Sequence, residues 1–172
     1  WLRERKYLDE YVRFWFRGNA GKPQPHFHKF SSWAQTAIYE RSLVTGDGRF
    51  VQDLLPDLIA DYQVWEQEQQ GADGLFWQFD VRDGMEESIS GSRRAKNARP
   101  TINAYMYGNA RAISTIAARA GRSDLAREYA AKADTLANLV TSKLWDDPAK
   151  FFKVRLEDGE FSDAREAVGF VP

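Results

Sequence analysis

The chain has 172 residues, with 24 Lys and Arg against 25 Asp and Glu, so its net charge of −1 gives no overall field that would favour nucleic acid or an acidic membrane surface. It has no cysteine, which excludes disulfides and a thiolate nucleophile, and no apolar run approaches the roughly 20 residues of a membrane span. Aromatic residues make up 14% of the chain, which favours a flat-ringed ligand surface or an unusually aromatic core.

The N-terminal part predicts one helix followed by a loop. Aromatic residues at helical spacing, with basic residues between them, predict an amphipathic helix over residues 1–17. Glycine and proline in residues 18–25 end it. His26 and His28 follow, but the chain has no further histidine or cysteine to complete a metal site with them. We therefore expect a turn or a ligand contact there, and no metal.

A first pair of helices is predicted after this loop. Ser31 or Ser32 can cap a helix that continues at helical period and ends at Gly46. A longer helix follows over residues 50–65, with a kink near Pro56. The two form an antiparallel hairpin with a short connection.

A second pair of helices repeats this pattern. One helix starts near Ile102 and ends at Gly121, and Ser123 can cap the next, which runs to Leu144. Two similar hairpins are a weak internal repeat, and repeated helical hairpins are typical of a solenoid or a closed α/α toroid. The tail differs, because residues 151–156 alternate and Asp158-Gly159 is a turn signal, which predicts a small β-hairpin.

The segment between the hairpins concentrates carboxylates beside aromatic rings. Asp80, Asp83, Glu86 and Glu87 lie within eight positions and follow Trp77. Sugar rings offer C–H faces to aromatic rings and hydroxyl edges to carboxylates, so this composition favours sugar handling. Inverting glycoside cleavage uses a protonated carboxylic acid and a carboxylate roughly 6.5–9.5 Å apart, and burial with nearby like charge keeps such an acid protonated. The residues alone leave open that these acids are solvated loop residues or helix caps.

Other polar and aromatic residues are candidates for contact with a sugar. Trp33 and Trp77 could stack on sugar rings. Asn103 could bind a sugar hydroxyl, fix the acid-bearing loop or be one more polar residue of a first helical turn, and Tyr107 follows it by one turn. The candidate substrate-binding residues are Trp33, Trp77, Asp80, Asp83, Glu87, Arg99, Asn103 and Tyr107.

Several short sequence motifs resemble those of the six-hairpin, (α/α)6-barrel glycoside hydrolases of the mannosylglycerate hydrolase, processing α-glucosidase and trehalase type. They are Gly-Met-Glu-Glu-Ser at residues 84–88, Ile-Asn-Ala-Tyr at 102–105, Leu-Trp-Asp at 144–146 with Phe-Phe at 151–152, and the strip 165–172. The resemblance implies a mainly α fold, in which antiparallel helical hairpins form part of an (α/α)6 toroid with a small β-hairpin near the C-terminus.

The resemblance also implies a function. When the family's acid-bearing motif is compared with this sequence residue by residue, its general acid corresponds to Glu86, with Glu87 as the alternative. The family's general base belongs to a later hairpin, outside this chain. We therefore expect a fragment of an inverting glycoside hydrolase that cleaves α-linked O-glycosidic bonds without a cofactor. Two departures prevent a transfer of substrate identity: Glu86 replaces an Asp of the best-known phrase, and Trp33-Ala34 replaces a frequent Trp-Asp.

The extent of the chain leads to further expectations. The chain starts at Trp1 and ends in an apolar phrase, and about five helices cannot close a toroid of twelve. We expect a single partial domain over residues 1–172, cut at both ends and inactive alone. It would either self-associate through exposed inner faces or be an arc-shaped monomer without turnover. Two other functions stay open, a non-catalytic carbohydrate-binding helical-repeat module and an α/α-toroid sugar epimerase or lyase. The last relies on histidine or tyrosine bases, and both histidines lie in one loop.

Overall fold

The computed structural model describes residues 4–84 and 88–172 and is mainly helical. Its helices are α1 (Lys6–Arg17), α2 (Ala34–Thr45), α3 (Gly48–Asp53), α4 (Leu55–Gln69), α5 (Pro100–Arg119) and α6 (Ser123–Lys143), with 3₁₀ helices η1 (Asp80–Arg82) and η2 (Ala167–Phe170). β1 (Trp77–Gln78) pairs antiparallel with β2 (Asn97–Ala98), and β3 (Trp145–Asp146) with β4 (Phe151–Phe152). The chain is therefore a set of helical hairpins with two small strand pairs, as an incomplete helical toroid requires.

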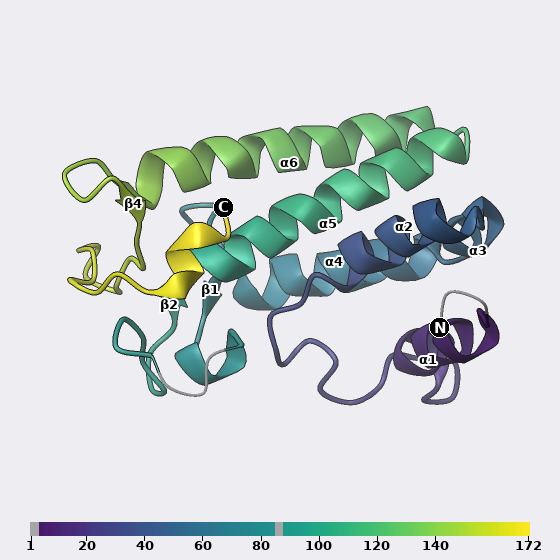
Figure 1. Cartoon of the computed structure of the whole chain (residues 1–172), viewed down its shortest axis with the longest axis horizontal. Coiled ribbons are helices and arrows are strands. Elements are labelled where there is room, and N and C mark those ends of the chain that lie inside the picture. The colour runs from purple at the N-terminus through teal and green to yellow at the C-terminus, as the bar shows by residue number, and fades with distance from the viewer. Residues whose placement is uncertain (1–3, 85–87) are drawn as a thin grey trace.

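Helix α5 is the centre of the packing. It contacts α6, α2 and α4, and these four helices run along the long axis of the molecule (Figure 1). Its side chains Ile102, Met106, Ile113 and Ile116, at helical spacing, are all at most 1% exposed. Burying a side chain of this size stabilises the fold by about 1.5–3 kcal/mol. The strand pairs and both 3₁₀ helices lie at the end where α5 begins, opposite the α5–α6 turn (Figure 1).

The predicted helical hairpins are confirmed, with three corrections. The helix predicted over residues 50–65 is two helices, α3 and α4, separated at Leu54. Pro56 does not kink a helix but lies in the first turn of α4, where its missing N–H leaves no intrahelical bond unmade. Ser123 does not cap α6, because it is the first helical residue and the N-cap Arg122 makes no side-chain cap bond.

The tail forms the predicted turn but pairs differently from the expected hairpin. Gly159 has φ of 89°, which suits a glycine turn, and Leu156 N donates to Glu160 O at 2.8 Å. Arg155 and Phe161 form an isolated bridge across this turn, and Ser162 N donates to Val154 O at 2.9 Å, whereas the regular strand pair of the tail is β3 with β4. Arg155 also exchanges two backbone hydrogen bonds of 3.0 Å with Ala98, next to the first helix residue of α5. The tail is thereby attached to the end of the molecule at which α5 begins.

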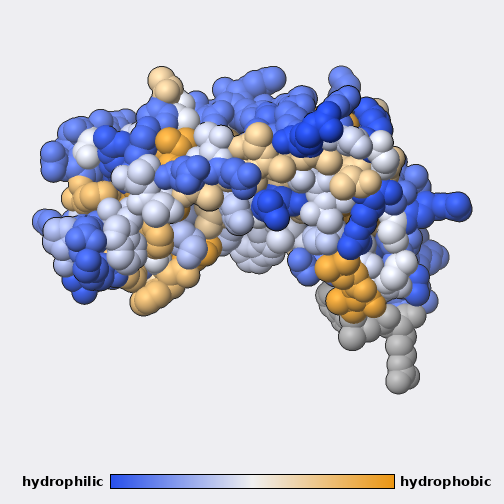
Figure 2. Space-filling model, turned by 90° about the horizontal axis from the view of Figure 1, so that it is seen from above, coloured by the Kyte–Doolittle hydropathy of each residue, from blue (hydrophilic) through white to orange (hydrophobic). Residues whose placement is uncertain are grey.

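The surface combines hydrophilic regions with separate apolar patches, one of them at the end where α1 lies (Figure 2). The most exposed large apolar and aromatic side chains are Tyr7, Tyr11, Phe14, Phe30, Trp33, Val44, Ile89 and Phe170. Self-association through such faces stays a prediction. Within residues 4–84 and 88–172, no helix is long and apolar enough to span a bilayer.

Candidate functional site

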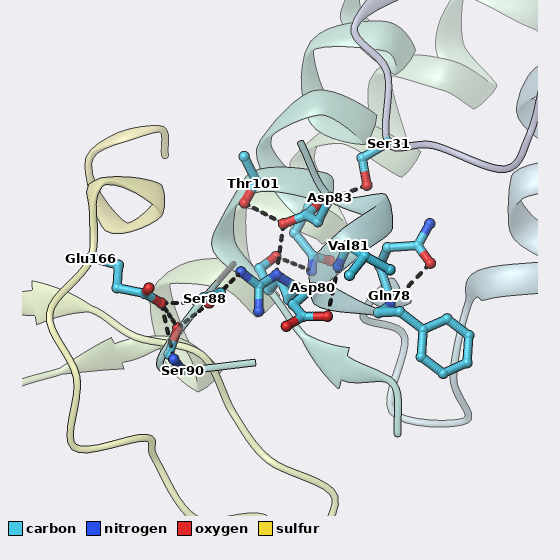
Figure 3. A network of polar contacts seen from close by, with 12 residues as sticks. Ser31, Gln78, Asp80, Val81, Asp83, Ser88, Ser90, Thr101 and Glu166 are labelled. Atoms are coloured by element: carbon cyan, nitrogen blue, oxygen red, sulfur yellow. Dashed lines mark hydrogen bonds and ion pairs between the residues drawn. The ribbon is translucent and has the colours of Figure 1, made fainter. Parts of the chain in front are cut away.

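Asp83 lies at the centre of a buried polar network (Figure 3). Its Oδ1 accepts a hydrogen bond from Ser31 Oγ at 2.5 Å, and its Oδ2 accepts from Arg99 Nε at 2.8 Å and from Thr101 Oγ1 at 2.5 Å. The side chains of Asp83 and Arg99 are both 0% exposed. The carboxylate thus joins three segments: the loop before α2, the end of η1 and the start of α5.

Burial is the largest cause of the pKa shift of Asp83 among the residues that the structure describes. Loss of water raises the pKa of the Asp83 carboxyl, and the guanidinium of Arg99 and the hydroxyls of Ser31 and Thr101 oppose that rise. No described carboxylate contributes to the shift. The ion pair with Arg99 therefore favours the charged form of a carboxyl group whose burial favours the neutral acid.

Arg99 binds residues on both sides of residues 84–87, which we call the acid-bearing segment. Its Nε binds Asp83 before that segment, and its Nη2 donates to Ser88 Oγ at 3.3 Å after it. The predicted acid Glu86 and its alternative Glu87 lie outside the described residues. Asp83 and Ser88, one on each side of residues 84–87, are therefore both bound to one guanidinium, that of the N-cap residue of α5.

Asp80 has a local role in shaping the backbone. Its Oδ1 accepts from Val81 N at 2.6 Å, its own N–H donates to Ser92 O at 3.2 Å, and the residue is only 4% exposed. A Cβ added to Gly91 would lie 2.3 Å from Asp80 Cβ, so the two backbone segments are in close contact. Asp80 is therefore neither a solvated loop residue nor a helix cap, since it is buried and the N-cap of η1 is Phe79; contact with substrate stays a prediction.

Asn103 fixes the strand that leads into the segment, the second of its three expected roles. It is 0% exposed, and its Oδ1 accepts from Phe76 N at 2.8 Å while its Nδ2 donates to Phe76 O and to Arg99 O, both at 2.8 Å. The amide thus fastens β1 to α5 just where Arg99 enters the helix. A contact with a sugar hydroxyl would require this buried set of bonds to open.

Replacing Asn103 with alanine is expected to lower the free energy of unfolding by about 1–3 kcal/mol, because the N–H and C=O of Phe76 would stay buried without these partners. Urea denaturation measures this. Asn138→Ala, at an exposed position of α6, is the control and should change stability by less than about 0.5 kcal/mol. Equal effects of the two substitutions would contradict the role assigned to Asn103.

The aromatic candidates lie in three separate places. Trp77 is half-buried, donates from Nε1 to Asp73 Oδ1 at 3.1 Å, and lines a groove of about 440 Å³ with Arg155. Trp33 is 55% exposed at the start of α2. Tyr107 lines a different cavity, between α5, α6 and the C-terminal residues. The structure therefore brings together Asp83 and Arg99, with Asn103 and Asp80 beside them, but does not gather these three rings around them.

Tyr105 is a candidate that the sequence prediction missed. Its ring meets Trp33 edge-on, with centroids 5.0 Å apart. Burial raises the pKa of Tyr105, and the charge of Asp83 raises it further, so the aromatic pair borders the polar network. The available signal was the spacing of Thr101, Tyr105 and Asn109, which places them on one face of α5. Asn109 on that face donates to Ser32 O at 2.9 Å and so aligns α2 with α5.

Glu166 is the second residue that was missed. It belonged to a phrase used only for the resemblance, yet its carboxylate binds Ser88, Ile89 and Ser90 (Figure 3). These partners are 76 to 78 positions away in the sequence, so no local pattern could indicate them.

The histidine loop makes one buried contact. His28 Nε2 lies 2.6 Å from Asp61 Oδ1, close enough for an ion pair although not aligned as a hydrogen bond. Among the described residues no group of three His, Cys, Asp or Glu side chains could hold a metal ion.

Comparison with known proteins assigns this architecture to a family. The sequence model of the mannosylglycerate hydrolase MGH1-like glycoside hydrolase domain matches residues 1–172. The chain belongs to this family. The comparison of this chain with curated proteins found no match.

Two solved structures resemble the MGH1-like domain. A protein named sialidase shares 46% sequence identity and superposes with a TM-score of 0.95, over 98% of this chain and 15% of its own. A family GH78 rhamnosidase from Bacillus sp. GL1 shares 21% identity at a TM-score of 0.64, over 77% of this chain and 14% of its own, and so supports the fold alone. The MGH1-like domain thus spans about 15% of the length of the sialidase. The expected resemblance and the mainly helical fold of antiparallel hairpins are confirmed.

Proposed function

We propose that this glycoside hydrolase domain supplies the general acid for inverting cleavage of α-linked O-glycosidic bonds, and that Glu86 is that acid. The observation that carries the proposal is the attachment of both flanks of the segment to Arg99, through Asp83 and Ser88. A catalytic carboxylic acid must be held in a fixed place to protonate a leaving oxygen. Here a fully buried guanidinium provides that support from the rigid start of α5.

The chemistry follows the two-carboxylate scheme. Glu86 donates its proton to the glycosidic oxygen as the bond to the anomeric carbon breaks, and a carboxylate from outside this chain removes a proton from the attacking water. The water attacks the face opposite the leaving group, so the configuration inverts. The exposed Trp33, edge-on to the half-buried Tyr105, offers apolar ring surface for the sugar. The name of the 46% identical sialidase supports glycoside hydrolysis in general, but it belongs to a chain of which only 15% is matched.

Replacing Glu86 with glutamine in the intact protein tests the proposal. We expect hydrolysis of α-linked disaccharides to fall by about 10²–10⁴-fold, because glutamine cannot donate the proton. A 2,4-dinitrophenyl glycoside of the same sugar should be affected far less, since its leaving group needs no proton. The panel covers α-glucosides, α-mannosides, α-rhamnosides and sialosides.

Glu160→Gln is the matched control, because Glu160 is exposed and its hydrogen bonds with the described residues come from its backbone. Undiminished disaccharide hydrolysis by the Glu86→Gln protein would refute the acid assignment, and a first-formed product of retained configuration in NMR spectra would refute inversion. If the parent protein hydrolyses none of the panel, the non-catalytic carbohydrate-binding module becomes the better interpretation.

A further inference from the structure

The carboxylate of Glu166 accepts hydrogen bonds from every residue just after the acid-bearing segment. Oε1 accepts from Ile89 N at 3.0 Å, and Oε2 accepts from Ser88 Oγ at 2.7 Å and from Ser90 N at 3.1 Å. Ser90 Oγ also donates to Oε2. Two backbone N–H groups and two hydroxyls thus converge on one side chain (Figure 3).

This arrangement is that of an anchor and not of a base. A carboxylate has about four acceptor sites, and the four hydrogen bonds from residues 88–90 are as many as these sites, which fits a residue that holds a loop better than one that takes a proton from water. Hydrogen bonds to an ionised acceptor are also the stronger kind, which suits a residue that holds a loop.

The position of Glu166 is itself fixed by close packing. Glu166 is the N-cap of η2, and Gly169 N donates to Glu166 O at 2.9 Å. A Cβ added to Gly169 would lie 2.2 Å from Phe151 Cε1 and 2.3 Å from Phe152 O, so η2 is in direct contact with β4. The anchor therefore comes from a part of the chain that is rigidly docked against the second strand pair.

The anchor is continuous with the Asp83 network. Ser88 Oγ accepts from Arg99 Nη2 at 3.3 Å and donates to Glu166, while the same guanidinium holds Asp83. Asp83, before the acid-bearing segment, is thus bound by Arg99. Ser88, after it, is bound by both Arg99 and Glu166.

We propose that Glu166 is a positioning residue for the general acid. Its carboxylate fixes residues 88–90, which directly follow the acid-bearing segment. The inference rests on the proposed function, because Glu86 is the group to be positioned. Loss of Glu166 would leave the acid chemically intact but free to leave its place, so the defect is confined to reactions that need its proton.

The test compares Glu166→Ala, Glu166→Gln and the control Glu160→Gln in the intact protein. We expect kcat of Glu166→Ala to fall by up to about 100-fold on α-linked disaccharides, and much less on 2,4-dinitrophenyl glycosides, with little change in KM. Glu166→Gln keeps an oxygen for Ile89 N and should rescue part of the loss. Hydrogen exchange of the Ile89 and Ser90 amides should be faster in Glu166→Ala, with the exchange of the α6 amides unchanged.

The outcomes separate this inference from the proposed function. Unchanged exchange at Ile89 and Ser90 in a folded Glu166→Ala protein would overturn the anchor, as would an equal loss on all leaving groups. If Glu86→Gln keeps its activity, or if the parent is inactive, the acid assignment fails while hydrogen exchange still decides whether Glu166 holds residues 88–90.

Discussion

Replacing Arg99 with methionine is expected to lower the free energy of unfolding by about 3–5 kcal/mol, because it leaves the carboxylate of Asp83 buried without its counter-charge. It also removes the bond to Ser88, so both flanks of the acid-bearing segment lose a shared partner. Urea denaturation measures the loss. The exposed pair of Arg127 and Asp124 provides the control, since Arg127→Met should cost at most about 1 kcal/mol.

The loss in the Arg99→Met protein should also depend on pH. Without the guanidinium, burial raises the pKa of the Asp83 carboxyl further above its value in the unfolded chain. The folded state then binds a proton that the unfolded state releases, so stability is highest in acid and falls as the pH rises through the raised pKa. Adding Asp83→Asn should recover part of the stability at neutral pH, because the orphaned charge is gone. A pH-independent loss, or a double variant no more stable than Arg99→Met, would contradict the buried ion pair.

Replacing Gly91 with alanine is expected to destabilise the fold by about 1–3 kcal/mol through overpacking. The new Cβ would lie 2.3 Å from Asp80 Cβ and 2.7 Å from Arg99 Nη1. Asp80 Cβ is next to the backbone of η1, so the two segments must separate and cannot relax through one flexible side chain. The bond between Arg99 and Ser88 should weaken as a result, which would slow disaccharide hydrolysis.

Gly48→Ala is the matched control for this substitution. A Cβ at Gly48 meets no heavy atom within 4 Å, and the residue lies at the start of α3, where alanine is favourable. Thermal denaturation of the two proteins should give a lower Tm for Gly91→Ala and an unchanged or higher one for Gly48→Ala. Equal Tm values would show that Gly91 does not pack as tightly as the distances state.

The sequence predicts the helices well because their signals are local. Apolar spacing identifies α2, α5 and α6, and glycine identifies the turns at Gly46 and Gly121. The kink at Pro56 was wrong because proline inside an apolar pattern is compatible both with a kink and with a new helix start, and only packing at Leu54 decides between them. The pairing of β3 with β4 was missed because two-residue strands carry too little alternation to be recognised.

The sequence picked out several residues that the fold brings together, but it did not indicate the contacts that they make. The sequence indicated Asp83, Arg99 and Asn103 as candidates, but it could not show whether they face a ligand or the interior. All three are at most 1% exposed. Their contacts with each other and with Phe76 explain why they are polar without a ligand. Glu166 was beyond reach for another reason, since its partners come from a distant part of the sequence and only the folded chain brings them together.

That separation has a consequence for the order in which the chain folds. Helices α5 and α6 form a local hairpin, whose contacts close short loops and should form early. The bonds of Glu166 to Ser88 and Ile89 close loops of 78 and 77 positions, so they can form only after the chain beyond α6 has been synthesised and η2 has docked on β4. During translation the helices would therefore form before Glu166 can bind Ser88 and Ile89.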